Sequence, residues 1–353
     1  MLTELNKKFK GVPSYLKDWV QTFKGGMTMF ILVLLFVIPF GSQDPYILGI
    51  FITFMIYTIF AASWDFLAGF VGQVSFGHAM FLGVSGYVTA YFIKFFSLPW
   101  WISLMSGAII AVLFGLIVGV PALRLKGPYL ALGTLSMSLI MYQLFLMGSV
   151  QTWWESVVGT QLFGAEGVSG IPRLSPDPQV EYLVTLIIMC LSLIVLIHIT
   201  KSKLGTIFKA IRDDETGTSA SGINTTKYKI IAFMISGFFA GIAGALFSMH
   251  FRGVNPGVYQ PLYSFFAIIM AALGGIATIS GAALGAFVFI FVNEILRFVK
   301  DIPLIEHSPF GPLMEPLFIF SFFLILVIRF SEHGLLQPAL ERVKELYDML
   351  LGR

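Results

Sequence analysis

Apolar runs recur along most of the chain and are separated by short polar or glycine-rich interruptions. A bilayer hydrocarbon core about 30 Å thick is crossed by roughly 20 apolar residues in helical conformation. The runs predict membrane-spanning helices near residues 27–41, 46–67, 76–96, 100–121, 128–150, 180–200, 228–250, 262–279, 280–298 and 312–330. The first run is short, so its helix is expected to begin nearer Phe23. This pattern predicts an all-α polytopic membrane protein with about ten transmembrane helices, with nine as the main alternative.

Glycines divide and pack the predicted helices. The stretch 262–298 is too long for one crossing, so we divide it at Ile279-Ser280-Gly281. Pairs of glycines four residues apart let helix backbones approach closely, and this chain has three such pairs: Gly115/Gly119, Gly237/Gly241 and Gly281/Gly285. We expect them to pack helices within one bundle, with dimerisation of subunits as the alternative.

Composition supports the membrane prediction and excludes other classes. Hydrophobic residues make up 57% of the chain and charged residues 12%, against roughly 45–50% and 25% in soluble proteins. The single cysteine, Cys190, excludes an internal disulfide framework and a cysteine-based zinc site, and no metal site is expected. The net charge of +3 is too small to indicate a nucleic-acid partner.

The distribution of Lys and Arg predicts the orientation. Cytoplasmic loops of membrane proteins collect these residues, and ten spans with both termini cytoplasmic place 17 of the 22 on the inside. The exceptions are Lys94, Arg173, Arg252, Arg297 and Lys300. A nine-span arrangement would put one of the basic blocks outside. The sequence therefore predicts a multi-pass membrane protein with both termini on the cytoplasmic side.

Three regions follow from these predictions. Residues 1–26 form a cytoplasmic segment with an interfacial helix, because apolar residues recur there with helical spacing. Residues 27–330 form the transmembrane domain, with a cytoplasmic loop at 201–229 and a periplasmic loop at 151–179. Residues 331–353 form a cytoplasmic C-terminal helix. Two halves of five spans would begin on opposite faces, as an inverted repeat requires, although the halves have no convincing sequence identity.

The loop 201–229 has its own helical pattern. Its apolar stripe is Leu204, Ile207, Phe208 and Ile211, and the charged run Arg212-Asp213-Asp214-Glu215 follows. A simple connection between two helices needs only a few residues. The loop is therefore either a docking element for a partner or a solvated amphipathic linker, and its residues alone favour neither.

Several stretches of the chain, taken in order, form a distinctive set. They are Ser63-Trp64-Asp65, GFVGQVSFGHAMFLGVSGY (69–87), PALRLKGPYLALGTL (121–135), GVSGIP (167–172), the loop 201–229, AFMISGFFAGIAGAL (232–246), ALGGIATISGAALGA (272–286) and Gly334-Leu335-Leu336. Together they resemble the M-type permease subunits of bacterial branched-chain amino acid ABC importers, and the likeness runs from about residue 46 to 337. The resemblance implies a multi-pass protein of a bacterial inner membrane.

The resemblance assigns a role to the cytoplasmic loop. In that family the corresponding loop carries a coupling helix that sits in a groove of a separate ATPase subunit. The residues of this chain that match the coupling motif are Arg212, Asp213, Asp214, Glu215 and Gly222. Gly217, Thr218 and Ser219 stand where the family usually has Ala, Ala and Glu. Because Gly costs a helix about 1 kcal/mol relative to Ala, we expect a shorter helix or one that becomes firm on docking.

The resemblance also implies partners. They are a second permease subunit forming a heterodimer, two ATPase subunits that bind ATP and Mg, and a periplasmic substrate-binding protein. The chain contains no Gly-Lys dipeptide, so it lacks the phosphate-binding loop of ATPases, and we expect neither a cofactor nor enzymatic activity in it. The expected cargo is a branched-chain or related small amino acid or amide, with urea and short amides as the alternative.

Polar residues at membrane depth are candidates for the translocation pathway. Asp65 lies near the cytoplasmic end of the second span, and His78 begins the third. Between them the segment 69–77 contains Gly72, Gln73 and Ser75, and it is predicted to be non-helical. Such backbone is tolerated in a membrane where protein buries it or water lines it.

Each of these residues also has a structural interpretation. Asp65 would cap the broken backbone near Gly69–Gly72, His78 would be a packed and hydrogen-bonded core residue, and the segment 69–77 would be a turn. Glu294 and Arg297, three residues apart, are expected to form an ion pair.

Two other classes of protein compete with the ABC permease. A proton- or ion-coupled secondary carrier would need Asp65 or His78 to titrate in the pathway. A non-transporting membrane scaffold would leave the coupling-like loop unexplained.

Overall fold

The computed structural model describes residues 23–300, apart from residues 126, 161 and 163. Within this part of the chain seven helices are long and apolar enough to cross a membrane, and the apolar helices Ile31–Gly41 and Pro261–Gly274 are shorter. The protein is therefore a polytopic helical membrane protein, as predicted. The predicted span 312–330, the segment 1–22 and the C-terminal helix 331–353 lie outside the described residues.

The elements follow one another in a simple order. The first half contains α2 (Phe23–Gly41), α3 (Pro45–Asp65), the π-helical turn η1 (Phe66–Phe70), α4 (Ala79–Phe96), α5 (Trp100–Ala122), α6 (Pro128–Leu146) and α7 (Gly148–Val158). The second half contains β1 (Val168–Ser169), α8 (Pro178–Lys201), α9 (Lys203–Asp213), α10 (Glu215–Ala220), α11 (Thr225–His250), β2 (Gly253–Val254), the 3-10 turn η2 (Pro256–Tyr259), α12 (Pro261–Gly274) and α13 (Ile279–Lys300).

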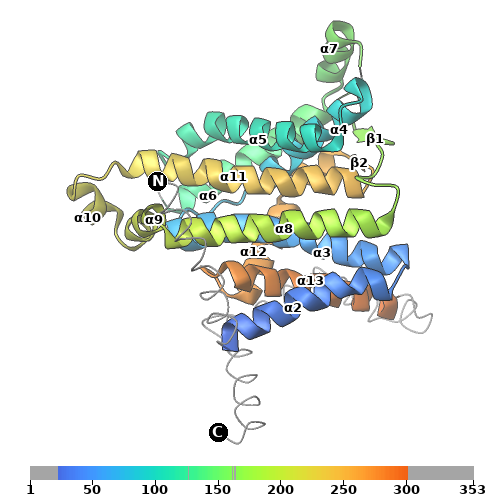
Figure 1. The fold of residues 1–353 in the computed structure, drawn as a ribbon. Helices are drawn as coiled ribbons and strands as arrows, with labels where there is room; N and C mark the ends of the chain where they lie inside the picture. Colours follow the sequence, from blue (N-terminus) through green and yellow to red (C-terminus); the bar gives the residue numbers. More distant parts are fainter. Residues whose placement is uncertain (1–22, 126, 161, 163, 301–353) are drawn as a thin grey trace, which may run out of the picture.

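The long helices form a bundle with two distinct ends. Figure 1 shows α9 and α10 at one end, and α7, β1 and β2 at the other. We call these the α9–α10 end and the α7 end. The strands β1 and β2 pair antiparallel, with Val168 opposite Val254, so they tie the connection before α8 to the connection after α11.

Two central helices organise the packing. Helices α3 and α11 pack against each other; α4 and α5 pack on α11, whereas α12 and α13 pack on α3. In the most apolar stretches of α3, α4 and α11, between 67% and 72% of the helix is buried. The buried share of the corresponding stretch is only 28% in α6 and 33% in α8. A helix that is apolar on every side yet exposed faces lipid or another subunit, so α6 and α8 lie at the periphery.

Local sequence signals explain several helix starts. Asp44 precedes Pro45 and accepts a hydrogen bond from the Tyr46 backbone N–H at 2.9 Å. Asp177 precedes Pro178 and accepts from the Gln179 N–H at 2.9 Å. An Asp cap followed by Pro at the first helical position satisfies one orphan donor and removes another.

Several predicted boundaries were wrong. The predicted span 128–150 ends earlier, at Leu146, and a separate helix, α7, occupies part of the predicted loop 151–179. The break predicted at 279–281 lies at Gly275–Thr278, because Gly275 and Ala277 adopt positive φ angles there. Helix α12 consequently has 14 residues, or about 21 Å at 1.5 Å per residue. That length is too short to cross a bilayer core alone.

The three glycine pairs pack helices within this chain, as predicted. A Cβ added at Gly115 or Gly237 would press on the Phe81 ring, at 2.5 and 2.7 Å respectively. Gly119 lies against Phe233 in the same way, and a side chain at Gly285 would collide with the Met270 carbonyl oxygen. These glycines let α5 and α11 close on α4, and let α13 close on α12.

Candidate functional site

A break between α3 and α4 lies at the α9–α10 end of the bundle. Helix α3 ends in the π-helical turn η1, and residues 72–78 are non-helical. Gly72 has a φ of +73°, a conformation that glycine adopts without strain. The prediction of non-helical backbone for 69–77 is therefore confirmed from residue 72 onward, whereas Gly69 belongs to the π-helical turn.

The segment 72–78 is anchored to three helices. The Trp64 indole N–H donates to the Ser75 carbonyl oxygen at 2.7 Å. The Phe76 N–H donates to Thr134 Oγ1 of α6 at 3.1 Å. The Ala79 N–H donates to Ser264 Oγ of α12 at 2.9 Å. Side chains thus replace the helical partners of this backbone, which permits an irregular segment at membrane depth.

Asp65 caps a different break from the one predicted. Its side chain is fully buried, and Oδ1 accepts a hydrogen bond from the Ala277 N–H at 2.7 Å. Ala277 lies in the break between α12 and α13, so Asp65 does not cap Gly69–Gly72. Gly69 is nevertheless close, because a Cβ added there would lie 2.5 Å from the Ala277 nitrogen. Asp65 therefore joins the end of α3 to the α12–α13 break.

His78 is a packed core residue. Its Nε2 lies 2.9 Å from Ser63 Oγ, and the Ser63 hydroxyl donates to the Phe60 carbonyl oxygen at 2.7 Å. Because the Ser63 hydroxyl proton is used in the bond to Phe60, His78 Nε2 is the donor to Ser63 Oγ, and Nδ1 carries the lone pair. The rings of Phe60 and Phe81 flank the imidazole, with centroids 5.3 and 5.4 Å away. These contacts match the structural interpretation of His78.

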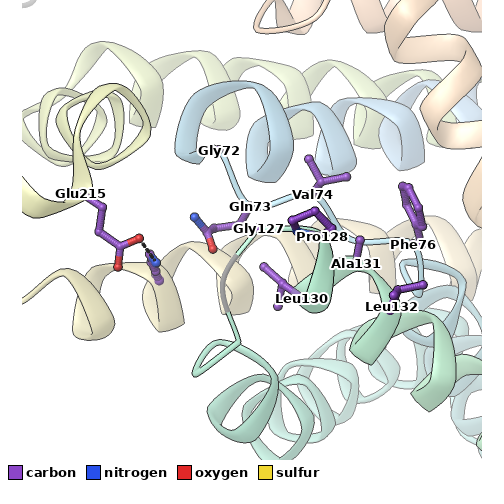
Figure 2. Close-up of a pocket in the computed structure, with 11 residues that line it drawn as sticks. Gly72, Gln73, Val74, Phe76, Gly127, Pro128, Leu130, Ala131, Leu132 and Glu215 are labelled. Atoms are coloured by element: carbon purple, nitrogen blue, oxygen red, sulfur yellow. Dashed lines mark ion pairs between the residues drawn. The ribbon is translucent and has the colours of Figure 1, made fainter.

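The predicted pathway residues separate into two groups. Gly72 and Gln73 line a cavity of about 440 Å³ together with residues of α6, α10 and α11. Figure 2 shows the Gln73 amide on the side of this cavity where Glu215 lies. Ser75, His78 and Asp65 are buried and are not among the residues that line the cavity.

The loop between α8 and α11 folds into the two short helices α9 and α10. Phe208 of the predicted stripe is fully buried. Its ring packs edge-to-face on the Phe66 ring, with the two ring centroids 5.7 Å apart. The Arg212 guanidinium donates to the Gly69 carbonyl oxygen at 3.0 Å, and the Arg212 side chain packs against Gly72. The loop is therefore folded and packed on the break between α3 and α4.

The charged run of this loop has several structural roles. Asp213 pairs with Arg212 at 2.8 Å, and its side chain is 64% exposed. Asp214 caps α10 by accepting from the Thr216 and Gly217 backbone N–H groups at 2.9 and 3.0 Å. Asp213 and Asp214 are both exposed, whereas Glu215 is half-buried. Helix α10 is short, with six residues.

Glu215 and Gly222 complete the coupling motif. Glu215 forms an ion pair with Lys229 of α11 at 2.5 Å, and Gly222 has a φ of +85° in the turn that leads into α11. Sequence analysis did not single out Lys229, which is 3% exposed. The available signal was its position in the first turns of an apolar helix, where an unpaired lysine is unfavourable.

A second buried pair also escaped the sequence analysis. His250 Nδ1 lies 2.8 Å from Glu181 Oε1, and His250 Nε2 lies 3.4 Å from Thr53 Oγ1. The pair joins the first turn of α8 to the last turn of α11, near the α7 end. The predicted pair of Glu294 and Arg297 is present at 3.9 Å. Among the described residues, no group of three or more His, Cys, Asp or Glu side chains could hold a metal ion.

Fold and site define a class of protein: a polytopic helical membrane protein with broken helices and a two-helix loop, α9 and α10, packed on one of the breaks. The sequence matches the family described as branched-chain amino acid transport system / permease component over residues 46–328. This match covers more than half of the chain, so the chain belongs to that family.

Relatives agree with this assignment. The high-affinity branched-chain amino acid transport system permease protein LivM of Salmonella typhimurium is 29% identical over 262 residues, which cover 69% of this chain and 62% of the relative. LivM of Escherichia coli gives the same values. BraD of Pseudomonas aeruginosa is 25% identical over 308 residues, covering 81% of this chain and 94% of the relative. The chain thus spans less than two thirds of the length of the two LivM proteins. No solved structure matches it significantly.

Proposed function

We propose that this chain is a membrane-spanning permease subunit of an ABC importer that carries branched-chain or related small amino acids or amides across a bacterial inner membrane. Separate ATPase subunits supply the energy. The names of its relatives support the class of cargo, and urea or another short amide is the alternative within the same mechanism.

One observation carries the proposal. The loop bearing Arg212–Glu215 lies at one end of the bundle and contacts the broken backbone between α3 and α4 through Phe208 and Arg212. Asp65, at the end of α3, accepts a hydrogen bond from Ala277 in the break between α12 and α13. A partner that pushes on α9 and α10 would therefore move two helix breaks, which are weaker points than continuous helix because they lack regular backbone hydrogen bonds.

The charge distribution supports the orientation. Arg124 and the basic residues of 201–229 lie at the α9–α10 end, and basic residues accumulate on the cytoplasmic side. We assign this end to the cytoplasm and the α7 end to the periplasm. Both termini would then be cytoplasmic, and the substrate-binding protein would dock at the α7 end. A second permease subunit and two ATPases would complete the complex.

Packing supports a five-plus-five inverted repeat. Helices α4 and α5 of the first half pack against α11 of the second half. Helices α12 and α13 of the second half pack against α3 of the first half. The irregular segment before α4 begins at the α9–α10 end, and the irregular segment before α12 begins at the α7 end, where β2 pairs with β1. The first turns of α4 and α12 meet through the bond from Ala79 to Ser264. Inverted repeats with discontinuous helices are typical of transporters.

The buried pair of Glu181 and His250 favours one other candidate, a proton-coupled carrier. Ionisable residues at membrane depth often relay protons, and this pair joins two helices near the proposed periplasmic end. Asp65 Oδ1 and His78 Nε2 are engaged in contacts that hold the backbone and the core, whereas Asp65 Oδ2 and His78 Nδ1 are buried without a partner among the described residues.

Uptake by reconstituted membranes tests the proposal. Proteoliposomes should contain the permease subunits and ATPases, with the binding protein and labelled leucine on the outer side and ATP on the inner side. We expect uptake that depends on ATP and survives collapse of the proton gradient by an ionophore. Uptake that is lost with the gradient while ATP persists would instead establish the carrier, and a variant with Glu181→Gln would then be inactive.

A further inference from the structure

The cavity at the α9–α10 end has one polar end and one apolar end. Its polar end is formed by Gln73, Glu215 and Lys229. Its apolar end is formed by Val74, Phe76, Pro128, Leu130, Ala131 and Leu132. Figure 2 shows Phe76 and Leu132 at the opposite side of the cavity from Glu215. A volume of about 440 Å³ lies within the usual range for small-molecule sites.

The polar end offers both charges that a zwitterion needs. Lys229 Nζ and Glu215 Oε2 are 2.5 Å apart, and the Lys229 side chain is only 4% exposed. An ammonium group would bind the Glu215 carboxylate, and a carboxylate would bind the Lys229 ammonium group. The Gln73 amide is weakly engaged, since Nε2 donates to the Val71 carbonyl oxygen at 3.4 Å, and it can turn to the ligand carboxylate.

The apolar end suits a branched aliphatic side chain. Its lining residues carry no charge, and Val74 and Leu132 are 39% and 54% exposed. An aliphatic side chain that packs on them leaves water itself, which is favourable. Because the charges lie at one end only, a ligand with polar groups at both ends would leave one of them without a partner.

We propose that this cavity is a binding site for an α-amino acid with a branched aliphatic side chain on the cytoplasmic side of the permease. The assignment of the side and of the cargo class rests on the proposed function. In the bound state the ammonium group contacts Glu215, the carboxylate contacts Lys229 and Gln73, and the side chain lies between Phe76 and Leu132. The ligand separates Glu215 from Lys229 and replaces one ion pair by two.

Ligand analogues test the charge pattern. Binding is measured on the assembled complex of permease and ATPase subunits in nanodiscs, without the binding protein and without ATP. We expect labelled leucine to bind. We expect 4-methylpentanoate, which lacks the ammonium group, 3-methylbutylamine, which lacks the carboxylate, and glycine, which lacks the side chain, each to compete at least about tenfold more weakly.

Variants separate this cavity from any other leucine site in the complex. Glu215→Gln should weaken leucine binding at least about tenfold but leave 4-methylpentanoate binding unchanged or tighter, because it frees Lys229. A general loss of structure would weaken both ligands. Leu132→Trp fills the apolar end without touching the ion pair and should also abolish leucine binding. Lys227→Gln changes an exposed lysine one half-turn from Lys229 and should have no effect.

The outcomes distinguish this site from the proposed function. Leucine binding that is indifferent to both Glu215→Gln and Leu132→Trp would overturn the site. Absence of leucine binding in a complex that imports leucine with ATP would overturn it as well, and would leave the proposed function intact. Binding with the expected analogue and variant pattern in a complex that never imports leucine would support the site and contradict the importer.

Discussion

Asp65 and His78 make contacts that a neutral side chain of similar shape can keep. Asp65 supplies one acceptor to the Ala277 N–H, and His78 supplies one donor to Ser63. Loss of either contact would leave a buried polar group without a partner, at a cost of about 1–3 kcal/mol. At the residue scale, these side chains hold backbone and core in place.

Substitution of Asp65 distinguishes capping from proton transfer. Asp65→Asn keeps a carbonyl oxygen for the Ala277 N–H and should retain substantial uptake. Asp65→Leu removes the acceptor and should destabilise the protein by about 1–3 kcal/mol. His78→Gln can still donate to Ser63 and should keep part of the activity. ATP-driven uptake and thermal unfolding of the assembled complex measure both effects, and inactivity of a stable, assembled Asp65→Asn complex would count against the capping role.

A single methyl group at Gly77 should disrupt the irregular segment. A Cβ there would collide with the Thr134 carbonyl oxygen of α6, and the backbone on both sides is anchored. We expect Gly77→Ala to lower the free energy of unfolding by about 1–3 kcal/mol, as overpacking does. Gly148→Ala is the matched control, because nothing lies within 4 Å of its added Cβ. Equal melting temperatures for the two variants would contradict the close approach of the segment 72–78 to α6.

At the scale of elements, α9 and α10 are fastened to their own chain and also carry an exposed carboxylate that suits the proposed docking role. Phe208 and Arg212 fasten the pair of helices to their own chain, while the Asp213 carboxylate points to solvent. Asp214 and Glu215 keep the short helix α10 folded and attached to α11. A docking element needs this rigidity, because a loose loop would absorb a partner's motion instead of transmitting it.

Removal of the three acidic side chains should uncouple the complex. With Asp213, Asp214 and Glu215 all changed to Ala, the permease should still insert, but α10 loses its cap, worth about 1 kcal/mol, and its tie to Lys229. ATP hydrolysis should then become independent of the binding protein, with little uptake. Lys227→Gln on the neighbouring turn provides the control. Normal uptake and normal stimulation of hydrolysis in the triple variant would refute this role.

At the scale of the whole molecule, the two ends of the bundle should lie on opposite sides of the membrane. Gly164 is bonded to the end of α6, where its N–H donates to the Phe145 carbonyl oxygen at 2.7 Å, and Ser219 lies in α10 at the other end. A topology reporter fused after Gly164 should report the periplasm, and one after Ser219 or Arg353 the cytoplasm. A cytoplasmic signal after Gly164 would refute the orientation.

Elements that depend on composition and local signals could be predicted from the sequence. The long apolar runs, the Asp-Pro caps of α3 and α8, and the extra helix in the loop 201–229 all reflect interactions within about 20 residues. The break at Gly275–Thr278 was misplaced by a few residues, because one of its contacts, from the Ala277 N–H to Asp65, involves another helix and leaves no local signal. Helix α7 was missed because a helix of 11 residues with mixed polar and apolar positions resembles a polar loop.

By itself the sequence determined that the chain spans a membrane as helices, and that the loop 201–229 is rich in basic residues and has a helical pattern of its own. These properties follow from hydrophobicity and charge, which each residue carries wherever it lies. Only the tertiary structure decided which partners the polar residues have: Asp65 with Ala277, Arg212 with Gly69, and Glu215 with Lys229. These partners are separated by long stretches of sequence or depend on an exact approach of two helices, so no local pattern records them. The cavity between Gln73, Leu132 and Lys229 likewise exists only because four elements meet there.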